Sequence, residues 1–237
     1  MKIQVVATAR QLSAVPTENK TVVVIDVLRA TSVITTALMN GASAVWPVSS
    51  AEEAGRLAEK FAPGWAFRCG EREGRIIPGF DLGNSPLEFT KDIVAGKNII
   101  LTTTNGTVAI QQSHAASRLY IVSFLNLSFA AMKLAEFQDE LLIACSGTND
   151  LFSMDDALCA GMLIDTISQF QPLQVDDLGL TLQSFARQPG SLFQKLRNCY
   201  HLNYLLSIGY REDVDYCLQT DLFKVLPALQ NKTYLSL

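Results

Sequence analysis

Short apolar runs of strand length recur along the chain, and a polar turn follows each of them. The β-branched run at 22–25 is unbroken, which is typical of a strand covered on both faces. Further strands are predicted at 3–9, 44–48, 65–69, 97–102, 118–123 and 140–145.

Helical patterns separate these strands. Thr31 and Ser32 are expected to cap a helix that ends at Asn40-Gly41, since glycine readily adopts a left-handed C-cap. The alternation of strand and helix predicts an α/β fold with a mainly parallel or mixed sheet and helices on both faces. Other helices are predicted at 51–62, 86–94, 126–137, 153–170 and, after the turn 103–107, through His114.

From 176 onward the pattern is mainly helical. Helices are predicted at 177–186, 191–199 and 202–208, and the polar stretch 210–216 is compatible with another. The tail, at 223–227 and 233–237, is expected to return as an edge strand. We interpret 176–237 as a helical cap on the same core, so that residues 1–237 form a single α/β domain.

The stretch 21–38 places polar residues at the end of its buried strand. Asp26 follows the strand, Arg29 comes next, and Thr31 and Ser32 begin the helix. Ligands of open α/β sheets bind beyond the carboxyl ends of the strands, where helix N-termini favour anions. This stretch alone leaves two readings open: an Asp–Arg pair that pins a turn, or a metal or anion site.

A long loop at 70–89 is rich in glycine, proline and charge. Long loops in compact domains are usually functional. This loop carries Glu71 and Asp81, followed by Asn84 and Ser85. An Asx-turn is the structural alternative for Asp81.

Two later junctions repeat the order strand, hydroxyl-rich turn, helix. Such turns offer backbone and side-chain donors to an oxyanion. Asp155 and Asp156 follow the second turn, where the helix dipole alone is a sufficient reason for acidic residues. The candidate donors are Thr104, Asn105, Gly106 and Thr107 in the first turn, and Ser146 and Thr148 in the second.

Composition narrows the class of protein. The chain has 237 residues, 49% of them hydrophobic, and a net charge of −4, which gives no general attraction for nucleic acid or anionic membranes. Its five cysteines lack a CxxC spacing, which favours reduced thiols in a cytoplasmic protein. No run approaches the ~20 apolar residues that cross a bilayer.

Several catalytic motifs are missing. The sequence has no GxSxG, GxGxxG or GxxxxGK[ST], and its two histidines, His114 and His201, lie in no recognisable catalytic setting. Cys145 and Cys159 lie in apolar runs that indicate core residues. What remains is carboxylates, one arginine and hydroxyl-rich turns, a set suited to Mg²⁺ and phosphoryl transfer.

Four segments together resemble the 2-phosphosulfolactate phosphatase family: VVVIDVLRATSVITTAL, GEREGRIIPGFDLGNSP, ILTTTNGTVAI and ACSGTNDLFSMDDALCAG. The resemblance implies a three-layer α/β/α fold, a homodimer and a Mg²⁺-dependent phosphatase. It implies hydrolysis of 2-phospho-3-sulfolactate to 3-sulfolactate and phosphate, a step of coenzyme M biosynthesis. Another small 2-phospho acid is the alternative substrate.

The combined hypothesis is a Mg²⁺-dependent phosphatase that acts on a small anionic phosphoester through a water nucleophile. Asp26 as a nucleophile ranks second, because Leu28 stands where an Asp-x-Asp pair would have its second acid. A non-catalytic anion-binding or regulatory protein is the alternative from another class. The predicted metal ligands are Asp26, Glu71, Asp81 and Asp156; the predicted catalytic residues are Asp26, Arg29, Asp81 and Asn105; the predicted substrate-binding residues are Arg29, Thr31, Ser32, Asn84, Ser85, Thr104, Asn105, Gly106, Thr107, Ser146 and Thr148.

Overall fold

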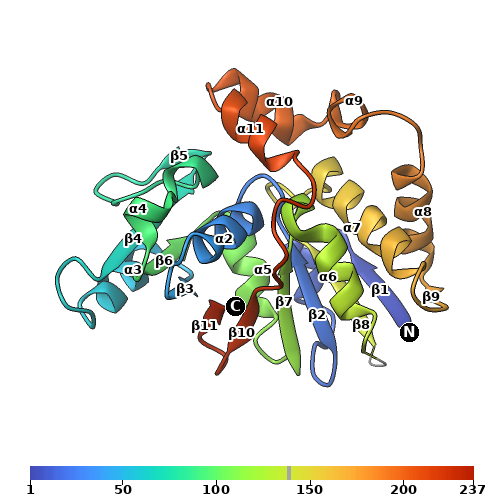
Figure 1. The fold of residues 1–237 in the computed structure, drawn as a ribbon, viewed down its shortest axis with the longest axis horizontal. Coiled ribbons are helices and arrows are strands. Elements are labelled where there is room, and N and C mark those ends of the chain that lie inside the picture. The colour runs from blue at the N-terminus through green and yellow to red at the C-terminus, as the bar shows by residue number, and fades with distance from the viewer. Residues whose placement is uncertain (138–139) are drawn as a thin grey trace.

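The strands form one mixed sheet at the centre of the molecule (Figure 1). In this computed structural model, which describes residues 1–137 and 140–237, their order is β5-β4-β6-β3-β11-β10-β7-β2-β8-β1-β9. Neighbours are parallel except in the β4–β5 pair and around β10 and β11. The bounds are β1 Lys2–Val6, β2 Thr21–Ile25, β3 Ala44–Pro47, β4 Ala66–Arg72, β5 Arg75–Ile76, β6 Asn98–Thr102, β7 Arg118–Val122, β8 Leu141–Cys145, β9 Gln174–Val175, β10 Ala228–Gln230 and β11 Tyr234–Ser236.

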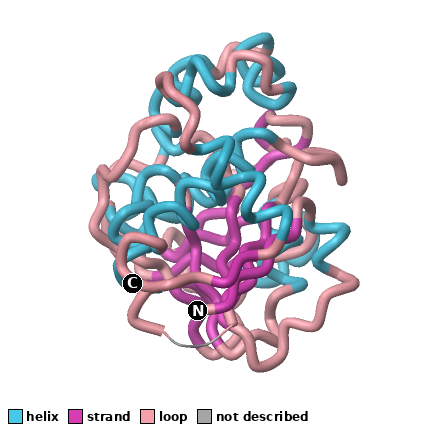
Figure 2. Tube along the Cα trace, turned by 90° about the vertical axis from the view of Figure 1, so that its right-hand side faces the viewer, coloured by secondary structure: helices cyan, strands magenta, loops and turns pink. Residues whose placement is uncertain are grey.

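Helices cover both faces of the sheet (Figure 2). α1, α2 and α5 share a buried apolar cluster with one face, and α6, α7 and α8 share a cluster with the other. The three-layer α/β/α prediction is therefore confirmed. No helix in the described part of the chain has the length and apolarity to cross a membrane. The bounds are α1 Ala9–Leu12, α2 Ala30–Met39, α3 Ala51–Ala58, α4 Lys91–Val94, α5 Gly106–Gln112, α6 Leu127–Leu134, α7 Met154–Ile167, α8 Asp177–Ala186, α9 Leu192–Leu196, α10 Tyr200–Ser207 and α11 Arg211–Cys217, with 3-10 turns η1 Pro86–Glu88 and η2 Phe124–Asn126.

Strand β2 shows how the sequence specifies these layers. Val22 and Val24 pack into the cluster of α1, α2 and α5, while Val23 and Ile25 pack into the cluster of α6 and α7. All four side chains are fully buried. A β-branched residue at every position is what a strand buried on both faces requires.

The segment 192–217 forms a cap of three helices, α9, α10 and α11, over one end of the sheet (Figure 1). Leu202, Leu205 and Val214 are buried in the same apolar cluster as α7. The cap thus shares its core with the α/β layers and closes over the strand ends where Asp26 lies.

The tail differs from its prediction as an edge strand. Residues 228–236 form a hairpin in the interior of the sheet, where β10 pairs with β7 and β11 pairs with β3. Leu235, opposite Val45, is fully buried. A hairpin of short strands fits here because its two outer edges pair with the edges of β3 and β7 that would otherwise be open.

Two helix boundaries also differ. The helix predicted at 86–94 is divided into η1 and α4, because the chain leaves helical geometry at Phe89, whose side chain is fully buried. Helix α2 begins at Ala30 with Arg29 as its N-cap, so that Thr31 and Ser32 lie inside the helix and do not cap it.

Candidate functional site

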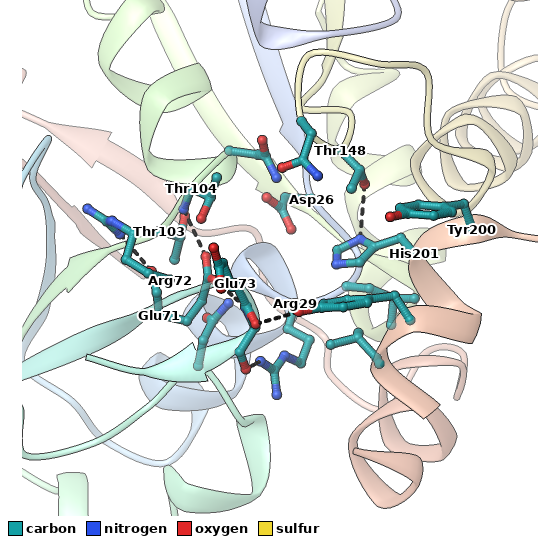
Figure 3. A pocket seen from close by; sticks show the side chains of 17 residues that line it. Asp26, Arg29, Glu71, Arg72, Glu73, Thr103, Thr104, Thr148, Tyr200 and His201 are labelled. Atoms are coloured by element: carbon teal, nitrogen blue, oxygen red, sulfur yellow. Dashed lines mark hydrogen bonds between the residues drawn. The ribbon is translucent and has the colours of Figure 1, made fainter. Parts of the chain in front are cut away.

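A cavity of about 530 Å³ lies between the carboxyl ends of the central strands and the helical cap (Figure 3). β2, β4, β6 and β8 each deliver residues to it just beyond their ends, and α10 closes it from the cap. This is the location at which α/β sheets bind ligands. The lining residues are Asp26, Leu28, Arg29, Glu71, Arg72, Glu73, Gly74, Asn84, Thr103, Thr104, Asn105, Thr148, Asn149, Tyr200, His201, Tyr204 and Leu205.

Asp26 is held in place by backbone and side-chain contacts. Its Oδ1 accepts a hydrogen bond from the amide of Ala30 at 3.1 Å. The Thr31 hydroxyl donates to the Asp26 carbonyl at 2.8 Å and accepts from the Asp26 amide at 3.2 Å. Thr31 therefore braces Asp26 and does not face the cavity as an oxyanion donor.

Asp156 connects two turns near Asp26, the turn after β2 and the turn after β8. Its Oδ1 accepts from the Val27 amide at 2.9 Å, and its Oδ2 accepts from the Gly147 amide at 3.0 Å. It is buried and does not line the cavity. Its carboxylate fixes the backbone after β2 relative to the turn after β8.

Burial and the neighbouring carboxylates raise the pKa of Asp26. Burial is the main cause that raises the pKa of Asp26 to about 7, and Asp155 and Glu71 add to it. The Ala30 amide and the Arg29 charge act in the opposite direction. Burial, with Asp155 and Asp26, also raises the pKa of Asp156. A proton or a cation bound near Asp26 would therefore stabilise the folded site.

Glu71 links two of the loops at the cavity. Its Oε1 accepts from the Thr104 amide and its Oε2 accepts from the Gly74 amide, each at 2.8 Å. Gly106 begins α5 directly beside Asp26, where an added Cβ would lie 2.6 Å from the Asp26 Oδ2. Only glycine permits this approach of the α5 start to the carboxylate.

Arg29 is a buried tie between the sheet and the cap. Its Nη1 donates to Asp213 Oδ2 at 2.5 Å, and its Nη2 donates to the Gly74 carbonyl at 2.6 Å. The Tyr210 ring lies 4.1 Å from the guanidinium carbon, and Ser85 donates to the other Asp213 oxygen at 2.7 Å. The charge of Arg29 is thus offset by Asp213, although Arg29 still lines the cavity.

We expect Asp213→Asn to lower the free energy of unfolding by about 3–5 kcal/mol, since it leaves the Arg29 charge buried without a counter-charge. Urea unfolding would measure this. Asp215→Asn is the matched control, because Asp215 is 57% exposed and pairs loosely with Arg211 at 3.7 Å. Its effect should stay within about 0.5 kcal/mol. Equal losses of unfolding free energy in the two variants would contradict the stabilising role of the Arg29–Asp213 pair.

The structure brings together seven of the residues predicted from the sequence. Asp26, Arg29, Glu71, Asn84, Thr104, Asn105 and Thr148 all line the cavity. The others lie outside this lining, and several are already bonded. Ser32 donates to the Val27 carbonyl, Ser85 donates to Asp213, and the Thr107 hydroxyl donates to the Thr103 carbonyl. Thr31, Gly106, Ser146 and Asp156 are, like these, not part of the lining.

Asp81 is the predicted ligand that the structure places elsewhere. Its side chain is 42% exposed, accepts from the Arg68 amide at 2.7 Å and lies 3.8 Å from the Arg68 guanidinium. It does not line the cavity. Its carboxylate holds the loop that follows β5 against β4, a structural role that differs from the local Asx-turn considered for it.

The cap supplies functional residues that sequence reasoning missed. His201 lies at the start of α10 and its Nδ1 is 3.1 Å from the Thr148 hydroxyl. Burial and, less strongly, Arg29 lower the pKa of His201, while Asp155 and Glu71 raise it. Nothing in the local sequence marked His201. Asp213 did carry a signal, as a carboxylate on the buried face of a helix that also holds Val214 and Cys217.

The donors at the cavity suit a hard cation that retains water and substrate ligands. Within residues 1–137 and 140–237, no three His, Cys, Asp or Glu side chains converge as a complete metal site. Mg²⁺ is commonly held by one or two carboxylates, with water and substrate phosphate oxygens filling its other positions. Asp26 and Glu71, with the amide oxygens of Asn84 and Asn105, are a donor set of that kind.

Comparison with known proteins gives one consistent result. The model of the family described as 2-phosphosulpholactate phosphatase matches residues 6–232. A protein of Caldanaerobacter subterraneus subsp. tengcongensis named probable 2-phosphosulfolactate phosphatase is 40% identical over 98% of this chain and 96% of its own. Proteins with the same name from Clostridium acetobutylicum and Thermotoga maritima are 38% and 41% identical, over 98% and 93% of each chain.

Proposed function

The chain belongs to the 2-phosphosulpholactate phosphatase family, and from this membership we propose that it hydrolyses 2-phosphosulfolactate to 3-sulfolactate and phosphate. The observation that carries the proposal is the cavity at the strand ends, which has a buried carboxyl group, Asp26, beside a turn of hydroxyl and amide groups. Phosphoryl transfer requires chiefly positioning and charge neutralisation.

We propose Mg²⁺ as the cofactor. Three carboxylates line the cavity, from Asp26, Glu71 and Glu73, and the substrate is itself an anion. Of the guanidinium groups in the lining, that of Arg29 is already paired. A divalent cation would neutralise the phosphoryl oxygens and relieve the charge on Asp26. Asp26 and Glu71 are the ligands we assign to it.

Other lining residues would bind and orient the substrate. Thr103, Thr104 and Asn105 present polar groups at the start of α5, where they would orient the phosphoryl group. Arg72 also lines the cavity, and its guanidinium donates to the Glu71 carbonyl at 2.6 Å and to the Thr102 hydroxyl at 3.1 Å. Its charge and remaining N–H groups suit the sulfonate or carboxylate. Water is the attacking group we propose, because Leu28 stands where an Asp-x-Asp nucleophile pair would have its second acid. The Ala30 amide holds Asp26 in place as the metal ligand.

The deciding experiment measures phosphate release from 2-phosphosulfolactate and phospholactate. We expect turnover with Mg²⁺ and none after chelation with EDTA. Thermal shift gives a second readout: Mg²⁺ at 100 times its Kd should stabilise the fold by about 2.7 kcal/mol. Stabilisation by phosphate or sulfonates without turnover of either substrate would favour a non-catalytic anion-binding protein.

The cellular setting is also a proposal. All five cysteines are free and buried, which suits the reducing cytoplasm. We propose a homodimer, which light scattering would test, and a place for the product in coenzyme M biosynthesis. The ratio of kcat/KM for 2-phosphosulfolactate to that for phospholactate separates this substrate from another small 2-phospho acid.

A further inference from the structure

His201 ends a chain of hydrogen bonds that runs away from the cavity. Its Nδ1 lies 3.1 Å from the Thr148 hydroxyl, which lies 3.1 Å from the Ser153 hydroxyl. Ser153 in turn donates to Oδ1 of Asp155. Asp155 is buried, and the Cys199 thiol also donates to that oxygen.

Asp155, the acceptor at the far end, sets the donor-to-acceptor direction of all these hydrogen bonds. A hydroxyl has one proton to donate. Ser153 uses its proton on Asp155, so its oxygen accepts the proton of Thr148. The Thr148 oxygen can then only accept from His201. The relay therefore places the imidazole proton on Nδ1 and leaves Nε2 as the acceptor.

The other edge of the ring faces the cavity. Figure 3 shows the His201 ring directed from Thr148 into the space that Asp26 and Arg29 also border. His201 is thus the lining residue with a free, neutral nitrogen acceptor opposite the proposed phosphoryl site.

We propose that His201 is the general base of the hydrolysis, a role that rests on the proposed function. Nε2 takes a proton from the attacking water as the water oxygen forms its bond to phosphorus. The ester P–O bond breaks and its electron pair stays on the substrate oxygen, which is protonated from solvent. The imidazolium then returns its proton to solvent. Thr148, Ser153 and Asp155 are positioning residues that hold the ring in the required tautomer.

The surroundings of the ring keep it in the neutral, basic form near neutral pH. Burial lowers the pKa of His201, and Arg29, at the start of α2, acts in the same direction. Asp155 on α7 and Glu71 on β4 oppose them. The other titratable or charged groups that line the cavity are Tyr200 and Tyr204 on its own helix, Asp26 after β2, Arg72 at the end of β4, and Glu73. Activity should accordingly rise as His201 loses its proton, with a midpoint below about 6.5.

His201→Asn tests the base, because the asparagine amide can still donate to Thr148 but offers no nitrogen base to the cavity. We expect kcat to fall by ~10²-fold or more while KM changes little, and the acid limb of the pH profile to become less steep, since Asp26 still titrates there. His114→Asn is the matched control, because it replaces the other histidine, which is half-buried and outside the cavity. It should leave kcat and the acid limb unchanged. A His201→Asn enzyme with wild-type kcat and acid limb would overturn the proposal.

A nitrogen-15 NMR measurement tests the relay independently of activity. With two histidines in the chain, the His114→Asn variant assigns the His201 signals. Wild-type protein should show the Nδ1–H tautomer. Ser153→Ala frees the Thr148 hydroxyl to donate to Nδ1, so the signals should move toward Nε2–H and kcat should fall roughly tenfold. An Nε2–H tautomer in the wild type would overturn the proposal. Absence of phosphate release from either substrate by the wild type would instead overturn the proposed function.

Discussion

Replacing Asp26 with asparagine is expected to reduce phosphate release by ~10³-fold or more and, at the same time, to stabilise the metal-free protein at pH 8. The loss of activity follows from the central position of the carboxylate in the cavity. The gain in stability follows from its burial, which makes the ionised form costly.

The pH dependence of stability separates this account from simple damage to the fold. The pKa of Asp26 is about 7 in the folded protein, against 3.8 for the ordinary carboxyl group. Between these values the folded state holds a proton that the unfolded chain has lost, so the free energy of unfolding falls as pH rises from about 4 to about 7. Each pKa unit corresponds to about 1.4 kcal/mol. Asparagine carries no charge, so the variant should lose the share of this dependence that Asp26 contributes, while Asp156, whose pKa burial also raises, keeps its own.

Urea unfolding of the metal-free protein at pH 5, 6, 7 and 8 measures both effects. Asp81→Asn is the matched control, since Asp81 is a half-exposed acid outside the cavity. It should keep wild-type activity and the wild-type pH dependence. If Asp26→Asn lowers stability at pH 8, or if Asp81→Asn loses activity as severely, our assignment of the two carboxylates is wrong.

The sequence predicted the layers well because burial leaves a local signature. The run at 22–25 is β-branched at every position, and the strands β6, β7 and β8 are also rich in buried apolar residues. The residues that follow such strands must lie at one edge of a parallel sheet. That is why Asp26, Thr104 and Thr148 were found as site residues.

Residue type alone could not distinguish a donor to a ligand from a brace. Thr31 and Ser32 have hydroxyls at a helix start, yet both bond to the backbone of the preceding turn. Asp81 has the chemistry of a metal ligand, but its partner Arg68 was not evident from the loop sequence. Asp213 and His201 are 184 and 53 residues from the partners that define their roles. Contacts at such separations arise from tertiary packing, which no local pattern records.

The hairpin of β10 and β11 leads to the second large effect. Removing residues 228–237 is expected to prevent the chain from forming its native sheet. The order β3-β11-β10-β7 means that β3 and β7 have no direct pairing, and strands in a sheet lie about 4.8 Å apart. Without the hairpin, both would become open edges that face each other across two vacant strand positions. Such edges promote aggregation.

A point substitution tests the same idea without removing chain. Leu235 is fully buried where β11 meets β3, and its neighbour Tyr234 contacts the Trp46 ring at 4.9 Å. Leu235→Ala should lower the free energy of unfolding by about 2–5 kcal/mol, as deletion of a buried leucine side chain does. Leu237→Ala, at a position 59% exposed, should change it by less than about 0.5 kcal/mol. Because the half of the sheet that carries Glu71 is joined to the half that carries Asp26 through this hairpin, the Leu235 variant should also lose Mg²⁺-dependent stabilisation at temperatures where the control retains it. A truncated protein that stays folded and active would show that the hairpin only covers edges that the two halves can close themselves.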